Sequence, residues 1–379
     1  MTSVLPYDEE SRCVRGDAAM ARRKAEYIFV PDKPKRNGFG CLFTVLAMVL
    51  AIGLAGFFYN MATNNRIQLM EEKVSVMGLN RAYEGFTILH ISDLHASAMG
   101  GNADMWTSVL FGKKWDAVVM SGDMVGSGGD FEPLLSLIHI LQQLKPSAPI
   151  YLIAGDDDPA AVPSAPRGTP EALADWVRVA QTAGAIYLDA PVAQTVGKKT
   201  VWFVPESLYG MDAAGSAASL QTQKEAMEAQ GQQYEVEGGA AYRGLCYRLD
   251  AMQRTVEAQK QMLSSDLQIA VSHAPLEKEY IRTSIEWADD SQALNFKAID
   301  LLMAGHYCAG QWRLPGAGPI YVPEVGWFPG DEGIVGMQRV NSINQYISPG
   351  VGASEYYPIK GRFLNNPAVT LLKFTATIY

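Results

Sequence analysis

The sequence has few cysteines, and their spacing forms neither a CxxC pair nor a regular ladder. Among 379 residues there are 4 cysteines, so a disulfide-stapled scaffold is excluded. Two of them lie in the amino-terminal tail and in an apolar run (Cys13 and Cys41), so only Cys246 and Cys308 could share a folded domain. The sequence leaves open whether those two pair, whether Cys308 binds a metal, or whether it is a buried inert thiol.

Excess basic charge is also lacking. The formal net charge is −9 and the pI is about 5.2, which argues against a nucleic-acid partner, because such binding needs a basic face. An anionic small substrate is not excluded, since a bound metal can reverse the local field. With 48% apolar and 19% charged residues, and neither an internal repeat nor a low-complexity tract, the chain is expected to be globular.

Only one long apolar run is present, over residues 38–59, where 22 residues carry no charge. A helix of that length spans about 33 Å, close to the hydrocarbon thickness of about 30 Å. A buried core helix and a cleaved signal peptide are the rivals, but signal-peptide cores are shorter, at about 7–15 residues. The run ends in Phe57, Phe58 and Tyr59, which suit a membrane interface. We therefore expect an uncleaved transmembrane helix.

The charges that flank the run predict its orientation. Six basic residues lie between Arg22 and Arg36, shortly before the run, whereas Arg66 is the only basic residue soon after it. The positive-inside rule puts residues 1–37 in the cytoplasm and the rest of the chain outside a cell membrane that it crosses once. Residues 60–75 are predicted to be a polar stalk, and residues 76–379 a folded domain.

Short apolar runs alternate with helical segments in this domain, which is typical of an α/β layered fold. Helices are expected over residues 131–144 and 170–184, and two more in an insertion near residues 209–265. The runs are nearly continuous in apolar character, as strands covered on both faces should be. The predicted strands are Phe86–Ser92, Ala117–Ser121, Ile150–Ala154, Thr200–Val204, Gln268–Ser272, Ile299–Ala304 and Ala368–Phe374.

Five of these runs end in side chains that can bind metal. Because ligands bind beyond the carboxyl ends of strands in open α/β sheets, the five ends should converge. Asp, His and thiolate together favour a transition metal over calcium or magnesium. His90 and His139 fall elsewhere and are predicted to be structural. The ends read Asp93-Leu94-His95, Gly122-Asp123, Gly155-Asp156-Asp157-Asp158, Ser272-His273 and Gly305-His306-Tyr307-Cys308.

This ordered series resembles the calcineurin-like metallophosphoesterase superfamily. The stretches FTILHISDLH (86–95) and QWRLP (311–315), followed by Tyr321-Val322-Pro323, are similar to its membrane-anchored bacterial branch. The resemblance implies a β-sandwich flanked by helices, a site for two divalent or mixed-valence transition metal ions (Zn, Fe or Mn), and hydrolysis of phosphomonoesters or phosphodiesters. By position it assigns Asp93, His95, Asp123 and Cys308 to one ion, and Asp123, Asp156, His273 and His306 to the other.

Two motifs depart from the pattern of that family. Gly155-Asp156-Asp157 stands where Gly-Asn-His is usual, so Asp157 replaces the histidine that acts as general acid, and Cys308-Ala309 replaces His-Gly. Asp157 can donate a proton only if burial or neighbouring charge raises its pKa, and a solvated turn is the alternative reading. The extra negative charge favours iron or zinc, or a phosphate held by Arg313, which is equally suited to a surface ion pair.

Two functions therefore compete. The first is a membrane-anchored phosphoester hydrolase that acts on a lipid or cell-wall precursor head group. The second is a metal-binding or partner-binding module that has kept the fold and lost turnover.

Overall fold

The computed structural model describes residues 38–163, 172–232 and 236–376. The predicted cytoplasmic tail and the predicted start of the helix at residue 170 lie outside these residues. Contacts divide the chain into a first unit that ends at Gly53 and a second unit over Leu54–Tyr379.

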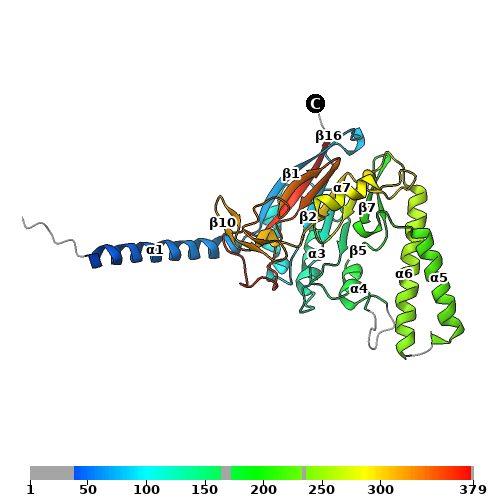
Figure 1. The fold of residues 1–379 in the computed structure, drawn as a ribbon, viewed down its shortest axis with the longest axis horizontal. Helices are drawn as coiled ribbons and strands as arrows, with labels where there is room; N and C mark the ends of the chain where they lie inside the picture. The colour runs from blue at the N-terminus through cyan, green and yellow to red at the C-terminus, as the bar shows by residue number, and fades with distance from the viewer. Residues whose placement is uncertain (1–37, 164–171, 233–235, 377–379) are drawn as a thin grey trace, which may run out of the picture. The chain divides into compact units, whose positions relative to one another are not determined.

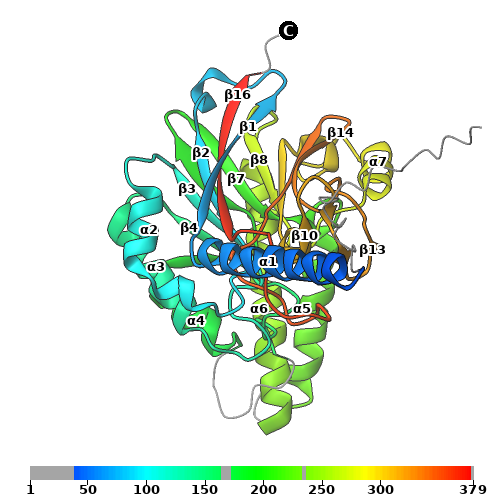
Figure 2. The same ribbon diagram turned by 90° about the vertical axis from the view of Figure 1, so that its left-hand side faces the viewer.

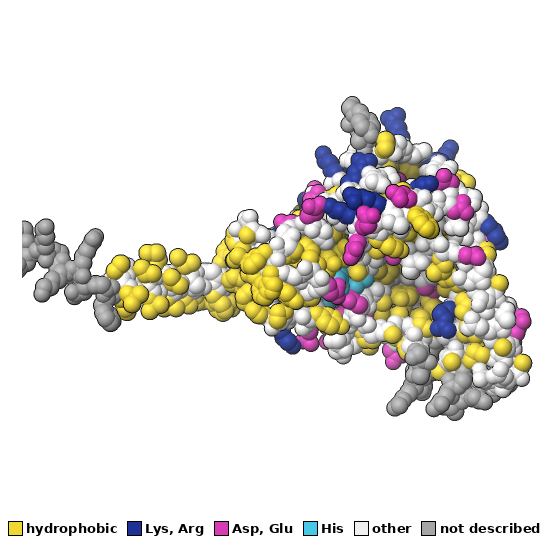
Figure 3. Space-filling view, in the orientation of Figure 1, with side chains coloured by type: hydrophobic (Ala, Val, Ile, Leu, Met, Phe, Trp, Pro, Cys, Tyr) yellow, Lys and Arg dark blue, Asp and Glu magenta, His cyan; other side chains and the backbone are white. Residues whose placement is uncertain are grey.

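Helix α1 (Gly38–Asn64) covers the predicted membrane segment. Its stretch Gly40–Asn64 is long and apolar enough to cross a membrane, and hydrophobic side chains cover its surface (Figure 3). The structure corrects the predicted stalk over residues 60–75, because α1 continues to Asn64 and Gln68–Val76 forms strand β1. That strand reads as polar because it lies at the edge of a sheet, with its first residues facing solvent.

Two six-stranded sheets form the second unit. In the first sheet the neighbours run in the order β1, β16, β2, β3, β4, β5, and β2 to β5 are parallel (Figures 1 and 2). Its other strands are β2 (Thr87–Ile91), β3 (Ala117–Ser121), β4 (Ile150–Ile153), β5 (Ala185–Tyr187) and β16 (Ala368–Ala376).

In the second sheet the order is β14, β15, β9, β8, β7, β6, and β7, β8, β9 and β15 are parallel. Each strand predicted from an apolar run is present within one or two residues of its predicted ends. The strands of this sheet are β6 (Val192–Val196), β7 (Lys199–Pro205), β8 (Leu267–Val271), β9 (Leu301–Ala304), β14 (Gly336–Val340) and β15 (Ile343–Ile347).

The two sheets pack face to face and helices cover their outer faces, which confirms the predicted sandwich. The shared core contains Ile88 of β2 and Ile269 of β8, and the rings of Tyr151 and Phe203 stack across it with centroids 4.0 Å apart. Alternate residues of β2, such as Leu89, pack outward against α2 (Ala103–Leu110), α3 (Glu132–Leu144) and α4 (Asp175–Thr182). The strands are apolar on both faces because both faces are covered.

Two long helices, α5 (Ala213–Ala229) and α6 (Val236–Gln261), form the insertion between β7 and β8 (Figure 1). They match the two helices predicted near residues 209–265. Part of α6 packs with α7 (Lys278–Glu286) on the outer face of the second sheet. The insertion thus leaves the order of the core strands unchanged.

Replacing Phe203 by Ala tests the sandwich. The side chain is fully buried against Tyr151, so we expect the free energy of unfolding to fall by about 3–5 kcal/mol. Phe111→Ala is the control, because that side chain is 83% exposed. Denaturant unfolding of the detergent-solubilised chain measures both, and equal effects would contradict the packing described.

Candidate metal centre

All five predicted strand ends meet at one edge of the sandwich. β2, β3 and β4 are parallel neighbours in one sheet, and β8 and β9 are parallel neighbours in the other. Their carboxyl ends therefore bring side chains from residues 93–95, 123, 156–157, 273 and 306–308 together without long loops.

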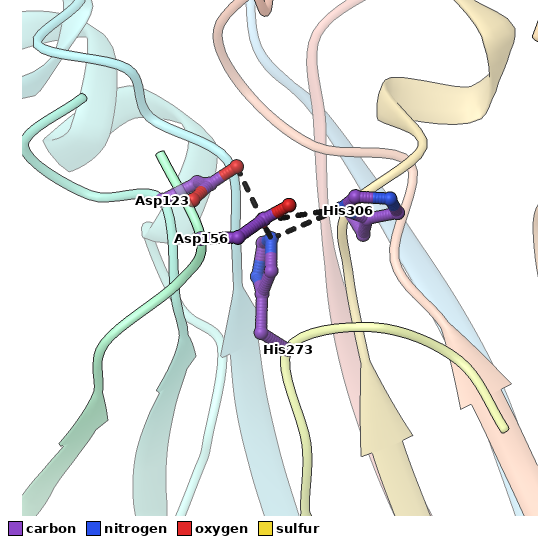
Figure 4. A group of neighbouring side chains, drawn as sticks. All are labelled: Asp123, Asp156, His273 and His306. Atoms are coloured by element: carbon purple, nitrogen blue, oxygen red, sulfur yellow. Dashed lines mark hydrogen bonds and ion pairs between the residues drawn. The ribbon is translucent and has the colours of Figure 1, made fainter. Parts of the chain in front are cut away.

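The first group consists of Asp123, Asp156, His273 and His306, whose ligand atoms all lie within 4.8 Å of one another (Figure 4). Nε2 of His273 lies 3.1 Å from Oδ2 of Asp123 and 2.6 Å from Oδ1 of Asp156. Nδ1 of His306 lies 3.3 Å from the same oxygen of Asp156. These four residues are the ones that the resemblance assigns to one ion.

The second group consists of Asp93, His95 and Cys308, and a third joins His95 to Asp123 and Asp157. The Cys308 Sγ atom lies 3.6 Å from Nε2 of His95, which in turn lies 3.6 Å from Oδ2 of Asp123. Asp123 thus belongs to the first and third groups and lies between the others. This is the position that a residue bridging two ions must take.

The backbone around Asp123 leaves no room for an extra side chain. A Cβ atom on Gly155 would lie 2.1 Å from Oδ1 of Asp123, and one on Gly122 would lie 2.5 Å from Nδ1 of His273. Several ligand candidates, including Asp93, Asp123 and His306, adopt left-handed φ angles of 51°, 54° and 79°. Such conformations are costly for residues other than glycine, and they cluster at functional sites.

Hydrogen bonds orient the two central side chains. Nδ1 of His273 donates to the backbone oxygen of Ser121 at 2.9 Å, which turns Nε2 toward the carboxylates of the group. The Asp158 carboxylate accepts from the backbone N–H groups of Met124, Val125, Gly126 and Gly155, at 2.7–3.2 Å. Asp158 therefore links the loop after β3 to the loop after β4 through hydrogen bonds. No role was predicted for Asp158 from the sequence, although it adjoins Asp156 and Asp157.

The electrostatics of the first group suit a cation. Burial alone lowers the pKa of His273, but the hydrogen bonds that the ring donates to the Asp123 and Asp156 carboxylates outweigh burial and raise the pKa to about 11. Hydrogen bonds from His273 and His306 in turn lower the pKa of Asp156. The carboxylates thus create a negative potential that favours a positive charge between them. The imidazole and carboxylate donors of this group therefore fit a transition metal ion.

Asp157 points into the third group rather than into solvent. Its Oδ2 atom lies 3.3 Å from Nδ1 of His95, and its backbone N–H donates to Oδ1 of Asp123 at 2.9 Å. Burial and the negative charge of Asp123 raise the pKa of Asp157. The alternative reading, a solvated turn, does not describe a side chain that is 5% exposed.

Cys308 is fully buried, and both it and Cys246 are free thiols, so the disulfide alternative does not apply. Burial raises the pKa of Cys308 well above its usual value, while the positive charge of Arg362 acts in the opposite direction. Arg362 is itself buried and donates to the backbone oxygens of Pro349, Gly352 and Asn365. No local pattern in the sequence indicates that Arg362 is buried near Cys308.

Arg313 does not line the cavity next to the first group. Its guanidinium lies 2.5 Å from Oδ1 of Asp331 and donates to the backbone oxygen of Ala309, so its contacts are those of an ion pair. A role in substrate binding stays a prediction. The cavity has a volume of about 250 Å³ and is lined by Asp123, Asp156, His306, Tyr307, Pro323, Glu324, Ser354, Tyr356 and Tyr357.

The other two histidines lie where structural residues are expected. His90 is fully buried in β2, with Nε2 2.9 Å from the Ser121 hydroxyl, and burial lowers its pKa to about 3. His139 lies on the exposed side of α3. Neither belongs to the groups that could hold a metal.

Part of the chain is similar in sequence to known metallophosphoesterases. A segment of 122 residues is 23% identical to an uncharacterised metallophosphoesterase, YkoQ, of Bacillus subtilis, and covers 31% of this chain and 44% of that protein. The chain thus spans less than half the length of this relative. The crystal structure of the phosphopantetheinyl hydrolase PptH from Mycobacterium tuberculosis aligns with a TM-score of 0.33 and 12% identity, over 70% of this chain and 91% of that one. Residues 86–309 match the calcineurin-like phosphoesterase family, and the chain belongs to that family.

Proposed function

We propose that this chain is a metal-dependent phosphoester hydrolase with a dinuclear centre. The observation that carries the proposal is the place of Asp123, whose carboxylate belongs to the group with His273 and His306 and to the group with His95 and Asp157. Two sets of donors that share a carboxylate suit a pair of neighbouring ions.

Asp123, Asp156, His273 and His306 would hold one ion, and Asp93, His95, Cys308 and Asp123 the other. Zinc, iron or manganese fits this mixture of imidazole, carboxylate and thiolate donors. Two such ions about 3.5–4 Å apart polarise a phosphoryl group and lower the pKa of water. Because the site holds several anions, a phosphate can enter only when positive charge is present there.

Asp157 takes the part of proton donor in this proposal. A raised pKa keeps a carboxylic acid protonated at higher pH, which general acid catalysis requires. The Ser354 hydroxyl donates to Oδ2 of Asp157 at 3.4 Å, and Ser354 also lines the cavity. Asp157 would thus deliver its proton to the leaving oxygen of a phosphoester in that cavity.

The length and composition of α1 support a membrane span, and the basic residues that precede it favour a catalytic domain outside the cytoplasm. The membrane would then be a partner of the chain. A lipid or cell-wall precursor head group is the substrate class that such anchoring favours.

A metal-binding or partner-binding module without turnover is the second candidate. The observation that favours it is Asp157, which adds a fifth acidic or thiol group beside the predicted ligands. More negative charge weakens the attraction for a phosphate. The two candidates differ in turnover and not in metal binding.

Metal analysis of the purified full chain tests the centre. We expect about two ions per chain, mainly zinc or iron, and clear loss of metal in Asp123→Asn because the shared ligand is weakened. Asp290→Asn is the control, since that carboxylate is exposed and pairs with Lys297. Recovery of only magnesium or manganese, or equal metal content in the two variants, would contradict the expectation.

The role of Asp157 is tested by its amide variant. Asp157→Asn keeps the shape but cannot give up a proton, so kcat on a phosphodiester with an alkyl leaving group, which needs a proton to depart, should fall by about 10²–10⁴-fold while the metal content stays. Asp130→Asn, an exposed change outside the site, should leave kcat unchanged. An unaltered kcat in Asp157→Asn would remove the residue from catalysis.

Asp157→His separates the two candidate functions. If the chain is a hydrolase that uses a carboxylic acid, this variant should keep turnover within about tenfold, because histidine is also a proton donor near neutral pH. If the chain is a module without turnover, the unmodified chain should bind metal fully, hydrolyse no ester in a broad panel, and gain activity only in Asp157→His.

A further inference from the structure

Large apolar side chains are exposed on the loops beside the cavity of the proposed site. They belong to segments 312–328 and 355–363 of the second unit, which we call the aromatic loop surface. Their exposed fractions run from 41% to 70%, and the residues are Leu314, Val325, Trp327, Phe328, Tyr356 and Ile359. Exposed apolar patches of this kind mark interaction sites.

The first of these segments is a connected structure and not a set of loose side chains. The Trp327 ring lies 5.0 Å from the Tyr321 ring and 6.3 Å from the Phe328 ring. The backbone of Phe328 donates to Ile320, and Ile320 donates to Trp312.

The two segments also join each other. The Trp312 and Phe363 rings lie 5.1 Å apart, and the backbone of Arg313 donates to that of Phe363. The exposed aromatic rings are therefore held out toward solvent by hydrogen-bonded backbone.

The same surface is hydrogen-bonded to the end of α1. Side-chain amides of Asn60 and Asn64 donate to the backbone oxygen of Arg362, at 3.0 and 2.5 Å, and the backbone N–H of Leu364 donates to Asn60 at 2.8 Å. Residues from Leu54 onward belong to the second unit, so these contacts lie within one unit.

One turn earlier on α1, Phe57, Phe58 and Tyr59 are 55–64% exposed. Aromatic side chains at the end of an apolar helix occupy the level of the lipid head groups. The aromatic loop surface is hydrogen-bonded to this end of the helix. The membrane that holds α1 is therefore the partner that this surface would contact. Figure 3 shows hydrophobic side chains gathered beside the hollow that holds acidic and histidine side chains.

The surface also borders the catalytic cavity. Pro323, Glu324 and Tyr356 line that cavity; Val325, which follows Glu324, is 48% exposed, and Tyr356 is itself 66% exposed. Oε2 of Glu324 lies 3.5 Å from Nε2 of His306, so the hairpin that presents Val325 and Trp327 reaches the metal centre itself.

We propose that the aromatic loop surface docks on the head-group region of the membrane that holds α1, and that the cavity takes the phosphoester head group of a membrane lipid. The proposal rests on the proposed hydrolase function for its second half. The lipid tails stay among the apolar side chains while the phosphoester enters between Tyr356 and Glu324. The lipid can therefore bind at the site without leaving the membrane completely.

Two measurements test the proposal on the full chain in phosphatidylcholine vesicles. The first is quenching of tryptophan fluorescence by lipid brominated near the head group. The fluorescence of Trp327 is obtained as the difference in emission between the unmodified chain and Trp327→Phe. We expect the brominated lipid to quench this fluorescence. That of Trp287, which is 84% exposed on the C-cap of α7 and outside the surface, should not be quenched.

The second measurement compares two phosphodiesters that share a 4-nitrophenyl leaving group, one with a methyl and one with a hexadecyl substituent. We expect the hexadecyl ester in vesicles to have a higher kcat/KM by at least about tenfold, because its chain stays in the lipid. Trp327→Ser combined with Phe328→Ser should remove this advantage and leave the methyl ester unaffected. Trp287→Ser should change neither.

The outcomes separate the docking from the chemistry. Turnover of the methyl ester without a hexadecyl advantage would overturn the lipid substrate and leave the hydrolase function intact. Quenching of Trp327 without turnover of either ester would support the docking of this surface on the membrane and would contradict the proposed hydrolase function. No quenching of Trp327 would overturn the docking, and a dimer that dissociates in the double variant would assign the surface to a second copy of the chain.

Discussion

Several acidic side chains lie within a few ångströms of one another at one edge of the sandwich. The loops around them are arranged so that this cluster of negative charge can be buried. Asp93, Asp123 and Asp157 are all buried, and Asp156 joins them from the rim. Buried carboxylates repel one another unless positive charge lies between them. The raised pKa of His273 has the same cause, because the carboxylates of Asp123 and Asp156 stabilise the protonated ring. The proposed pair of metal ions would supply the positive charge, with the donors already in place.

The surrounding backbone holds these side chains in place. Parallel strands bring the five ends together, Asp158 fastens two of the loops through four backbone N–H groups, and glycines at 122 and 155 let those loops touch. Arg362 adds a buried positive charge beside Cys308 and is held by backbone oxygens on the segment that follows β15. The same segment reaches the end of α1. Within the second unit, the last turns of α1 and the predicted centre are therefore joined through this segment.

The sequence predicted the features whose signals are local. Strands such as β3 and β8 are short apolar runs with a polar residue at the end, and both the strand and the placing of its last side chain follow from that pattern. The edge strand β1 lies in a segment predicted to be a stalk, because three charged residues, Glu71, Glu72 and Lys73, stand together at its centre. β15 was missed although it is buried, because Asn344 and Gln345 occupy it and are satisfied by backbone groups of Ser75 and Leu276. Such partners are distant in the sequence, as are those of Arg362 and Arg313, and no local pattern indicates them.

In the proposed centre, the Asp123 carboxylate would lie between two metal ions. Anomalous diffraction from crystals of the full chain, recorded at the zinc and iron absorption edges, would locate such ions. We expect two peaks about 3.5–4 Å apart that flank the Asp123 carboxylate, one beside His273 and His306 and the other beside His95 and Cys308. A single peak, or peaks that touch neither Asp123 nor His273, would contradict it.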